Sequence, residues 1–316
     1  MTSNVIEIGS AIPITPEIDE ISEDIFGLDR PSSILIVEGE TDKDLIEKYI
    51  FLKKIEINFS IRTAKMAEGG DRGGKKVAID YYRKNIGKQD IKLLIDRDYD
   101  FICSENIEDS NIFYYDYYEI ENYILEEKVL KHACISNNIS TEEINKVIEF
   151  LNSSDNEILS PLFECSKLRI FRELHKSDKT ELKLDSEVIE VYCEFAKDID
   201  IKGCLIGKKP EIRGSSFKER IDYYLYSKLH EIDSDLYSKI NVQLERFEIG
   251  YPNSIWDFLK YYYKGKDVIK FISDLFQYLG ILSCSLKEIN TKKLFNTYIF
   301  QSELYKEKME AIFESF

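Results

Sequence analysis

The sequence lacks the residue patterns of several common types of site. Its six cysteines are scattered and form no Cys-x-x-Cys pair: Cys103, Cys134, Cys165, Cys193, Cys204 and Cys284. A disulfide framework or a zinc knuckle is therefore not expected, whereas single buried thiols in a reducing cytosol are. The three histidines, His132, His175 and His230, are far apart and none lies near a Cys or Ser motif, so each is expected to be a surface or core residue.

Long apolar runs and an excess of positive charge are also missing. Without a signal peptide or an apolar span, the protein is expected to be cytoplasmic, with no membrane partner. The formal net charge of −16 argues against nucleic-acid binding by the whole surface. It does not exclude a metal-dependent nuclease, which carries an acidic site and needs only a local basic track. The 316 residues, 43% of them hydrophobic, suffice for two compact domains.

A short apolar run that ends on a carboxylate organises the first part of the chain. Residues 34–37 are apolar and mostly β-branched, which predicts a strand buried on both faces of a parallel sheet. Glu38 ends the run, Gly39 turns the chain, and Thr41 or Asp42 is expected to cap the helix that follows. Open α/β sheets bind ligands at this end of their strands. A divalent cation would offset the burial of Glu38, and the alternative is that Glu38 serves only as a cap of the following helix.

Further strands and helices are indicated by the spacing of apolar residues. Alternation over 55–61 predicts a second strand, and the runs 92–95 and 112–115 predict a third and a fourth. Short strands alternating with helices predict an α/β fold with a mostly parallel sheet flanked by helices. Beyond about residue 135, helical spacing prevails at 142–151, 161–175, 185–197, 215–231, 253–263, 266–280 and 287–314.

The chain is accordingly divided into three parts. Residues 1–30 form an N-terminal extension with seven acidic residues and one basic residue, residues 31–135 an α/β domain, and residues 136–316 a mostly α-helical domain. The extension is interpreted as a partly ordered tail, and an acidic arm that docks on a partner or on a basic groove of the chain itself is the alternative.

Carboxylates follow three of the predicted strands. Glu38 follows the first, Asp96, Asp98 and Asp100 follow the third, and Asp116, Glu119 and Glu121 follow the fourth. Parallel strands bring their carboxyl ends to one edge of a sheet, so these acids are expected to converge there. Carboxylate oxygens suit Mg²⁺ or Mn²⁺, and such a site can activate water for phosphodiester cleavage. A solvated acidic loop, or a calcium-like turn without catalysis, is the alternative.

A glycine-rich loop at 67–76 has two possible uses. Gly69, Gly74 and Lys75 satisfy the G-x-x-x-x-G-K pattern, but Lys76 stands where a P-loop needs Ser or Thr, and no buried strand leads into the loop. The preferred interpretation is that Arg72, Lys75 and Lys76 contact the phosphate backbone of a substrate, which the glycines allow to approach closely. A solvated surface loop is the alternative.

Aromatic residues cluster in two stretches. Tyr114, Tyr115, Tyr117, Tyr118 and Tyr123 form one, and Trp256, Phe258, Tyr261, Tyr262 and Tyr263 form the other. Base stacking is possible in principle. Alternation along a strand and periodicity along a helix make core packing the preferred interpretation of both.

The segments 36–42 (IVEGETD) and 94–100 (LIDRDYD) resemble the TOPRIM fold, which primases, topoisomerases and OLD-type nucleases share. The segment 117–123 (YYEIENY) is similar to a narrower group of bacterial TOPRIM proteins with a helical C-terminal half, which includes the nuclease effectors of the PARIS anti-phage defence system. The motifs cover residues 34 to about 125. The helical half agrees in general character, with 254–259 (SIWDFL) as the most suggestive piece.

This resemblance implies a magnesium-dependent TOPRIM nuclease, with residues 31–135 as its catalytic domain. It implies that an ATPase partner holds the protein inactive until infection, and that the released toxin effector cuts RNA such as transfer RNA. By position, Glu38 is implied as general base or metal ligand, and Asp96 and Asp98 as metal ligands. Glu121, together with Glu119, completes the implied catalytic and metal site.

Two relatives within the fold are set aside, and one alternative stays open. A topoisomerase needs a tyrosine nucleophile that cannot be singled out here, and a primase normally needs a zinc module that these cysteines do not supply. A non-catalytic subunit that keeps the fold and docks on an ATPase partner would carry the same acids. Homodimerisation is also possible.

Overall fold

The computed structural model describes residues 33–69, 73–87, 90–154, 156–176, 210–216, 218–220, 223, 234–281 and 298–316. The predicted extension 1–30 and the predicted helix 185–197 lie outside these ranges. The chain divides into two compact units, Met1–Leu94 together with Phe316, and Ile95–Ser315. The boundary expected near residue 135 thus falls inside the second unit.

A four-stranded parallel sheet in the order β2-β1-β3-β4 confirms the predicted α/β class. Its strands are β1 (Ser33–Val37), β2 (Phe59–Thr63), β3 (Asp90–Ile95) and β4 (Ile112–Tyr114). The central strand β1 pairs with β2 and β3, and Val37 is in register with Thr63 on one side and Leu94 on the other. Every residue of β1 is buried, as its continuous apolar run predicted.

The second strand begins later than its alternating pattern suggested. The structure places β2 at Phe59–Thr63, where Phe59, Ile61 and Thr63 are buried in alternation, rather than at 55–61. Residues 55–57 lie outside the strand, and the side chain of Ile57 is 38% exposed. The alternation of apolar and polar residues therefore begins before the strand, in the connection from the preceding helix.

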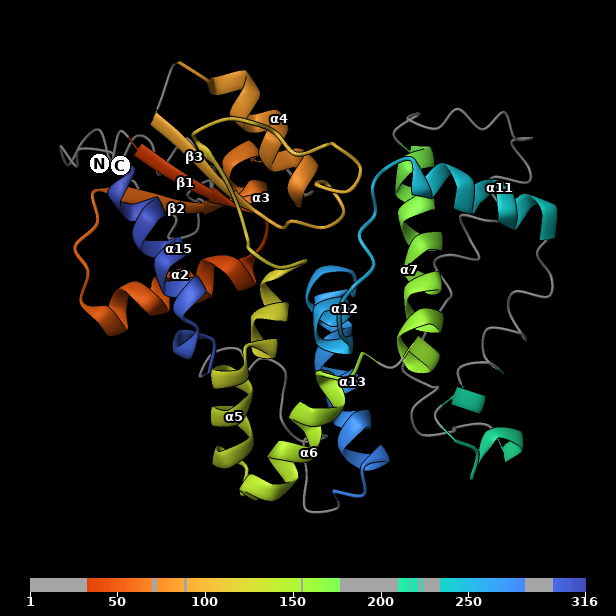
Figure 1. Cartoon of the computed structure of the whole chain (residues 1–316). Helices are drawn as coiled ribbons and strands as arrows, with labels where there is room; N and C mark the ends of the chain where they lie inside the picture. The colour runs from red at the N-terminus through yellow and green to blue at the C-terminus, as the bar shows by residue number, and fades with distance from the viewer. Residues whose placement is uncertain are drawn as a thin grey trace, which may run out of the picture. The chain divides into compact units, whose positions relative to one another are not determined.

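Three helices belong to the first unit: α2 (Glu40–Lys53), α3 (Ala64–Glu68) and α4 (Lys75–Asn85). Right-handed crossovers from β1 to β2 and back to β3 place α2 on one face of the sheet and α3 and α4 on the other (Figure 1). The expected N-cap of α2 was wrong by two or three residues. Gly39 caps the helix, and the Asp42 carboxylate accepts a hydrogen bond of 3.2 Å from its backbone N–H.

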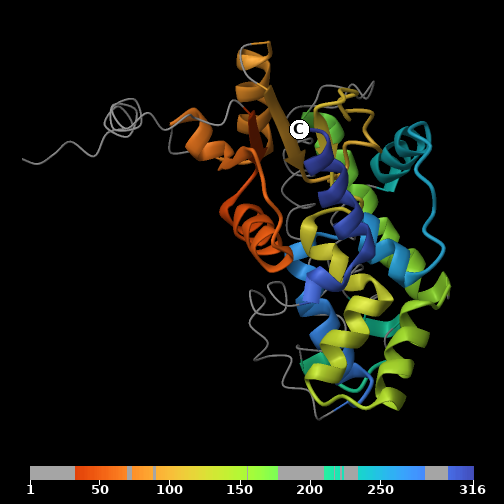
Figure 2. The same cartoon turned by 90° about the vertical axis from the view of Figure 1, so that its left-hand side faces the viewer.

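The second unit is mostly helical, as predicted. Its elements include η1 (Ile120–Leu125), α5 (Glu127–Ser136), α6 (Thr141–Leu151), α7 (Asn156–Lys176), η2 (Pro210–Ile212), α11 (Ser234–Glu245), α12 (Ile255–Tyr261), α13 (Gly265–Tyr278), η4 (Ile299–Gln301) and α15 (Glu303–Glu314). The pattern of apolar residues did not indicate α5 and α11, and most of the predicted helix 215–231 lies outside the described residues. In both views α12 lies beside α7 (Figures 1 and 2).

The cysteines in the described ranges agree with the expectation from their scattered positions. Cys103, Cys134 and Cys165 are buried thiols, and none of the three is in a disulfide. Across the described residues, every helix is too short or too polar to cross a membrane.

Candidate acidic site

The predicted acids are divided between the two units. Glu38 follows β1 in the first unit, and Asp96, Asp98, Glu119 and Glu121 belong to the second. Asp96 and Asp98 follow β3, whereas Glu119 and Glu121 lie at the start of the short 3-10 helix η1. All but Glu119 are half-buried, and Glu119 is buried.

The glycine-rich loop is hydrogen-bonded to the backbone of Glu38. The N–H of Gly74 donates a hydrogen bond of 3.3 Å to the carbonyl oxygen of Glu38. A Cβ on Gly73 would lie 3.5 Å from that same oxygen. Gly74 has a φ of 98°, which favours glycine, and α4 starts at the next residue with Lys75 and Lys76. The first unit thus connects its candidate catalytic acid to two of the predicted substrate-binding cations; Arg72 lies outside the described residues.

The loop does not have the surroundings of a P-loop. A P-loop follows directly on a strand, but the short helix α3 separates β2 from this loop. As the sequence indicated, the segment that leads into the loop is therefore not a buried strand. Phosphate contact by the lysines remains a prediction.

The backbone turns sharply at the second acidic motif. Asp98 has a φ of 46°, a left-handed conformation that costs most residues about 1 kcal/mol and that Asp tolerates better than most. Its N–H donates to the carbonyl of Tyr118 at 2.8 Å. Asp96 and Asp98 therefore do not both lie in extended backbone, because β3 ends at Ile95 and the chain turns. The Oδ1 atom of Asp96 is buried.

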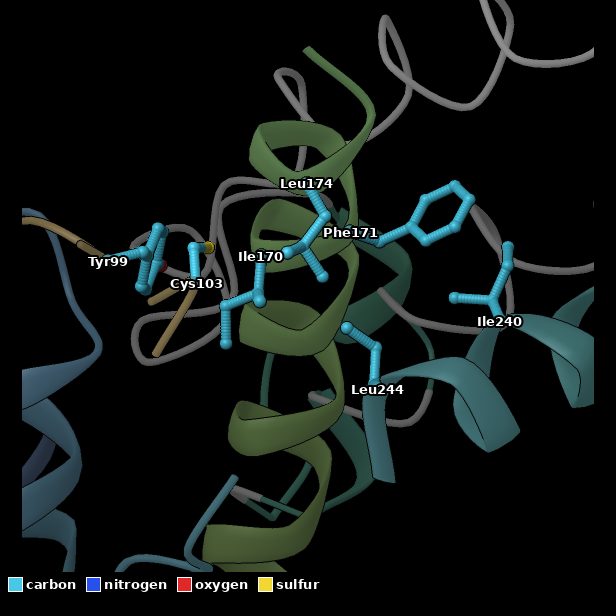
Figure 3. Close-up of a cluster of buried hydrophobic side chains, with 7 residues drawn as sticks. All are labelled: Tyr99, Cys103, Ile170, Phe171, Leu174, Ile240 and Leu244. Atoms are coloured by element: carbon cyan, nitrogen blue, oxygen red, sulfur yellow. The ribbon is translucent and has the colours of Figure 1, made fainter. Parts of the chain in front are cut away.

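Hydrophobic packing anchors this turn on α7. Tyr99 and Cys103 pack with Ile170, Phe171 and Leu174 of α7, and Ile240 and Leu244 of α11 complete the cluster (Figure 3). The Tyr99 hydroxyl also donates a 2.9 Å hydrogen bond to the carbonyl of Tyr262. Asp98 thus lies directly beside a residue that is fixed in the core of the second unit.

A buried asparagine holds the second pair of acids. Asn122 has no exposed surface, and its Nδ2 donates to the carbonyls of Leu259 at 2.7 Å and Tyr263 at 2.9 Å. Its Oδ1 accepts from the N–H of Glu119 at 3.0 Å. The side-chain amide of Asn122 therefore connects the turn between Glu119 and Glu121 to the last turn of α12 and to the residue just after its C-cap.

The first residue of α13 lies unusually close to the same turn. A Cβ on Gly265 would come within 2.6 Å of Asn122 Oδ1, 2.7 Å of Glu121 Cβ and 3.0 Å of Glu119 Cβ. The next residue, Lys266, donates its backbone N–H to Glu119 Oε2 at 3.3 Å. Only glycine permits this approach of the helix to the two glutamates.

Burial and neighbouring charges alter the acidity of Glu119. Desolvation is the main cause that raises the pKa of its carboxyl group from 4.5 to about 7, and the charges of Glu121 and Asp98 raise it further. The Lys266 N–H and the Lys266 charge act in the opposite direction. Glu119 therefore experiences electrostatic repulsion from both Glu121 and Asp98.

Asp116 has a structural role instead. Its carboxylate accepts a hydrogen bond of 2.5 Å from the Tyr123 hydroxyl and forms an ion pair of 2.9 Å with Lys308 of α15. These partners fix the segment between β4 and η1.

The donor chemistry of the candidate site fits Mg²⁺, which prefers carboxylate oxygens and usually takes one or two of them, with water and phosphate oxygens as its other ligands. A bound cation would relieve the electrostatic repulsion that Glu119 experiences from Glu121 and Asp98. Within the described ranges, no three Asp, Glu, His or Cys side chains are grouped closely enough to hold a metal ion by themselves. The full metal set Glu38, Asp96, Asp98, Glu119 and Glu121 therefore stays a prediction.

Two positioning residues were missed in the sequence. Asn122 follows Glu121 directly, and Gly265 follows three tyrosines and a lysine. An asparagine after an E-x-E pattern is a weak signal, and an isolated glycine has many possible explanations. Their importance depends on contacts across 137 or more residues, such as the bond from Asn122 to Leu259.

Comparison with known proteins leaves the candidate site to be interpreted from its geometry. No protein-family model matches the chain, and no curated protein matches it significantly.

Proposed function

We propose that the protein is a Mg²⁺-dependent TOPRIM nuclease that hydrolyses phosphodiester bonds of nucleic acid, with RNA such as transfer RNA as its substrate. The observation that carries this proposal is the state of Glu119: burial, and after it the charges of Glu121 and Asp98, raise the pKa of its carboxyl group to about 7. Acids collected in this way are a common feature of metal-dependent phosphoryl-transfer sites.

The sheet topology supports the same proposal. From β1 the chain crosses to β2 on one side, and from β2 it crosses back to β3 on the other side. The strand order thus reverses between β1 and β3, and α/β proteins bind ligands at the carboxyl ends of the strands at such a point. Glu38 follows β1 and Asp96 follows β3, which is the reason to expect a role for both.

In the proposed reaction, Glu38 takes the proton of the attacking water while the phosphodiester oxygen on the far side of the phosphorus departs. Asp96, Asp98 and Glu121, with Glu119, supply the carboxylate oxygens for the ion. A divalent ion bound there would activate the water and stabilise the leaving oxygen. Lys75 and Lys76, at the end of a loop bonded to Glu38, attract the phosphates next to the scissile bond.

The biological context rests on the sequence resemblance. As in the PARIS defence effectors, the chain would be a toxin that an ATPase partner holds inactive until phage infection. The acidic charge of −16 agrees with local rather than general contact to RNA.

Incubation of the purified chain with Mg²⁺ and total RNA tests the proposal. We expect cleavage that EDTA stops and that Glu38→Ala and Asp98→Asn abolish. The exposed Glu149 of α6 offers a matched control, because Glu149→Gln removes a carboxylate outside the site. If the free chain and the chain released from its ATPase partner both leave RNA intact, the protein is a non-catalytic docking subunit instead.

A further inference from the structure

A strip of neighbouring aromatic and cationic side chains in the second unit runs from two exposed rings to the buried ring of Tyr117 and the half-buried Lys260. We name Phe101, Arg97, Tyr261, Tyr117 and Lys260 the aromatic–cation strip. The Arg97 guanidinium lies 4.2 Å from the ring centroid of Phe101 and 5.7 Å from that of Tyr261. The rings of Tyr261 and Tyr117 meet edge-on at 5.6 Å, and Lys260 Nζ lies 5.3 Å from the Tyr117 ring.

Two rings of the strip are open to solvent. Phe101 is 41% exposed and Tyr261 is 37% exposed, whereas Tyr117, the third ring of the strip, is buried. The exposure of Tyr261 departs from the core packing that the sequence indicated for its stretch, because α12 turns this ring outward while Phe258 and Leu259 are fully buried.

The charge of Arg97 is held by these rings rather than by an acid. Arg97 lies between Asp96 and Asp98 in the sequence, yet it forms no ion pair with any described residue. An arginine stacked on aromatic rings keeps N–H groups available for a phosphate. A cation that alternates with exposed rings is the pattern of surfaces that bind unpaired nucleotides.

The strip adjoins the acidic site through the backbone. The N–H of Tyr118 donates to the carbonyl of Lys260 at 2.9 Å, and the carbonyl of Tyr118 accepts from the N–H of Asp98 at 2.8 Å. Glu119 follows Tyr118 directly, so one short segment connects the strip to both acidic motifs.

We propose that the aromatic–cation strip binds a single-stranded stretch of nucleic acid, with bases stacked on Phe101 and Tyr261 and a phosphate held by Arg97. This inference rests on the proposed nuclease function, and it adds that the strand cut at the acidic site is unpaired. Paired bases are already stacked in their helix and cannot lie on these rings, so the strip selects loops and ends.

The test separates binding from cleavage. Fluorescence anisotropy of a fluorescein-labelled oligoadenylate is measured at low salt in EDTA, with an RNA duplex of equal length for comparison. We expect Phe101→Leu and Tyr261→Leu each to weaken binding about tenfold or more. Tyr261→Phe keeps the ring and should bind as the wild type does. Tyr251→Leu is the matched control, because Tyr251 is 44% exposed and packs on Phe163 outside the strip.

The proposal is overturned if the wild type does not bind the oligoadenylate, if it binds the duplex equally well, or if the leucine variants bind as tightly as the wild type. Cleavage is then assayed with Mg²⁺ on the same variants. If the chain cuts RNA but its leucine variants bind normally, the proposed nuclease function stands and the proposed role of the strip is overturned. If the chain binds through the strip but cuts no RNA, the role of the strip stands and the nuclease function is overturned.

Discussion

Gly265 lies so close to Asn122 that a Cβ on the glycine would come within 2.6 Å of the asparagine Oδ1. The same Cβ would lie 2.7 Å from the Cβ of Glu121, an atom next to the backbone that cannot swing away. The first residue of α13 and the acidic turn of η1 therefore fit together only without a side chain at this position. This contact determines where both glutamates lie.

Gly265→Ala is expected to displace the acidic turn without removing any charge or hydrogen-bonding group. A shift of about 1 Å can reduce catalysis about 100-fold, so we expect kcat for RNA cleavage to fall by that order. The Mg²⁺ concentration needed for half-maximal cleavage should rise in parallel. Gly250→Ala is the matched control, because its Cβ would meet only the Tyr262 hydroxyl, at 4.0 Å. Equal activity of both variants would refute the positioning role.

Asn122→Ala is expected to destabilise the second unit. It leaves the carbonyls of Leu259 and Tyr263 and the N–H of Glu119 without their partner in a buried place. Each unsatisfied group costs about 1–3 kcal/mol, so the free energy of unfolding in urea should fall by about 3 kcal/mol or more. Asn137→Ala, which removes one hydrogen bond to the Ala133 carbonyl near the surface, should cost about 1 kcal/mol. Similar losses for the two variants would contradict this account of Asn122.

The raised pKa of Glu119 predicts a pH dependence of stability in metal-free buffer. Between pH 4.5 and about 7 the folded protein keeps a proton on Glu119 that the unfolded chain has lost. The free energy of unfolding should therefore fall as the pH rises through this range, by about 3 kcal/mol for this group. Glu119→Gln should remove this part of the dependence. A pH profile that is unchanged in the variant would show that Glu119 is not desolvated as described.

Simultaneous replacement of Arg72, Lys75 and Lys76 by alanine is expected to weaken RNA binding and to flatten its salt dependence. Each lost phosphate contact on a single strand reduces the slope of log K against log salt by about 0.7, so the triple variant should lose about 2. A control with Lys131→Ala and Lys146→Ala removes two cations that pair with glutamates on α5 and α6. An unchanged slope in the triple variant would show that the loop is a solvated surface loop that does not contact phosphates.

The sequence was most informative where local pattern and burial agree. The continuous apolar run of β1 predicted its complete burial, and the runs before Asp96 and Asp116 located β3 and β4 to within about two residues. The start of β2 was misplaced because alternation continued through the exposed connection at Ile57.

The strand ends that Glu38 and Asp96 follow could be predicted from local pattern, because each adjoins a buried apolar run. The residues that position Glu119 and Glu121 could not be predicted in this way. Asn122, Gly265 and the exposed ring of Tyr261 acquire their roles from contacts between η1 and the segment around α12 and α13. The left-handed turn at Asp98 likewise depends on its hydrogen bond to Tyr118, which no spacing rule indicates.

A metal site at these acids can be detected by electron paramagnetic resonance of Mn²⁺ added to the metal-free chain. We expect the wild type to bind Mn²⁺ and Mg²⁺ to compete for the same site. Asp98→Asn should weaken binding at least about tenfold, while Glu149→Gln leaves it unchanged. A wild type that binds no Mn²⁺, or an Asp98→Asn variant that binds it as tightly as the wild type, would show that these acids form no metal site.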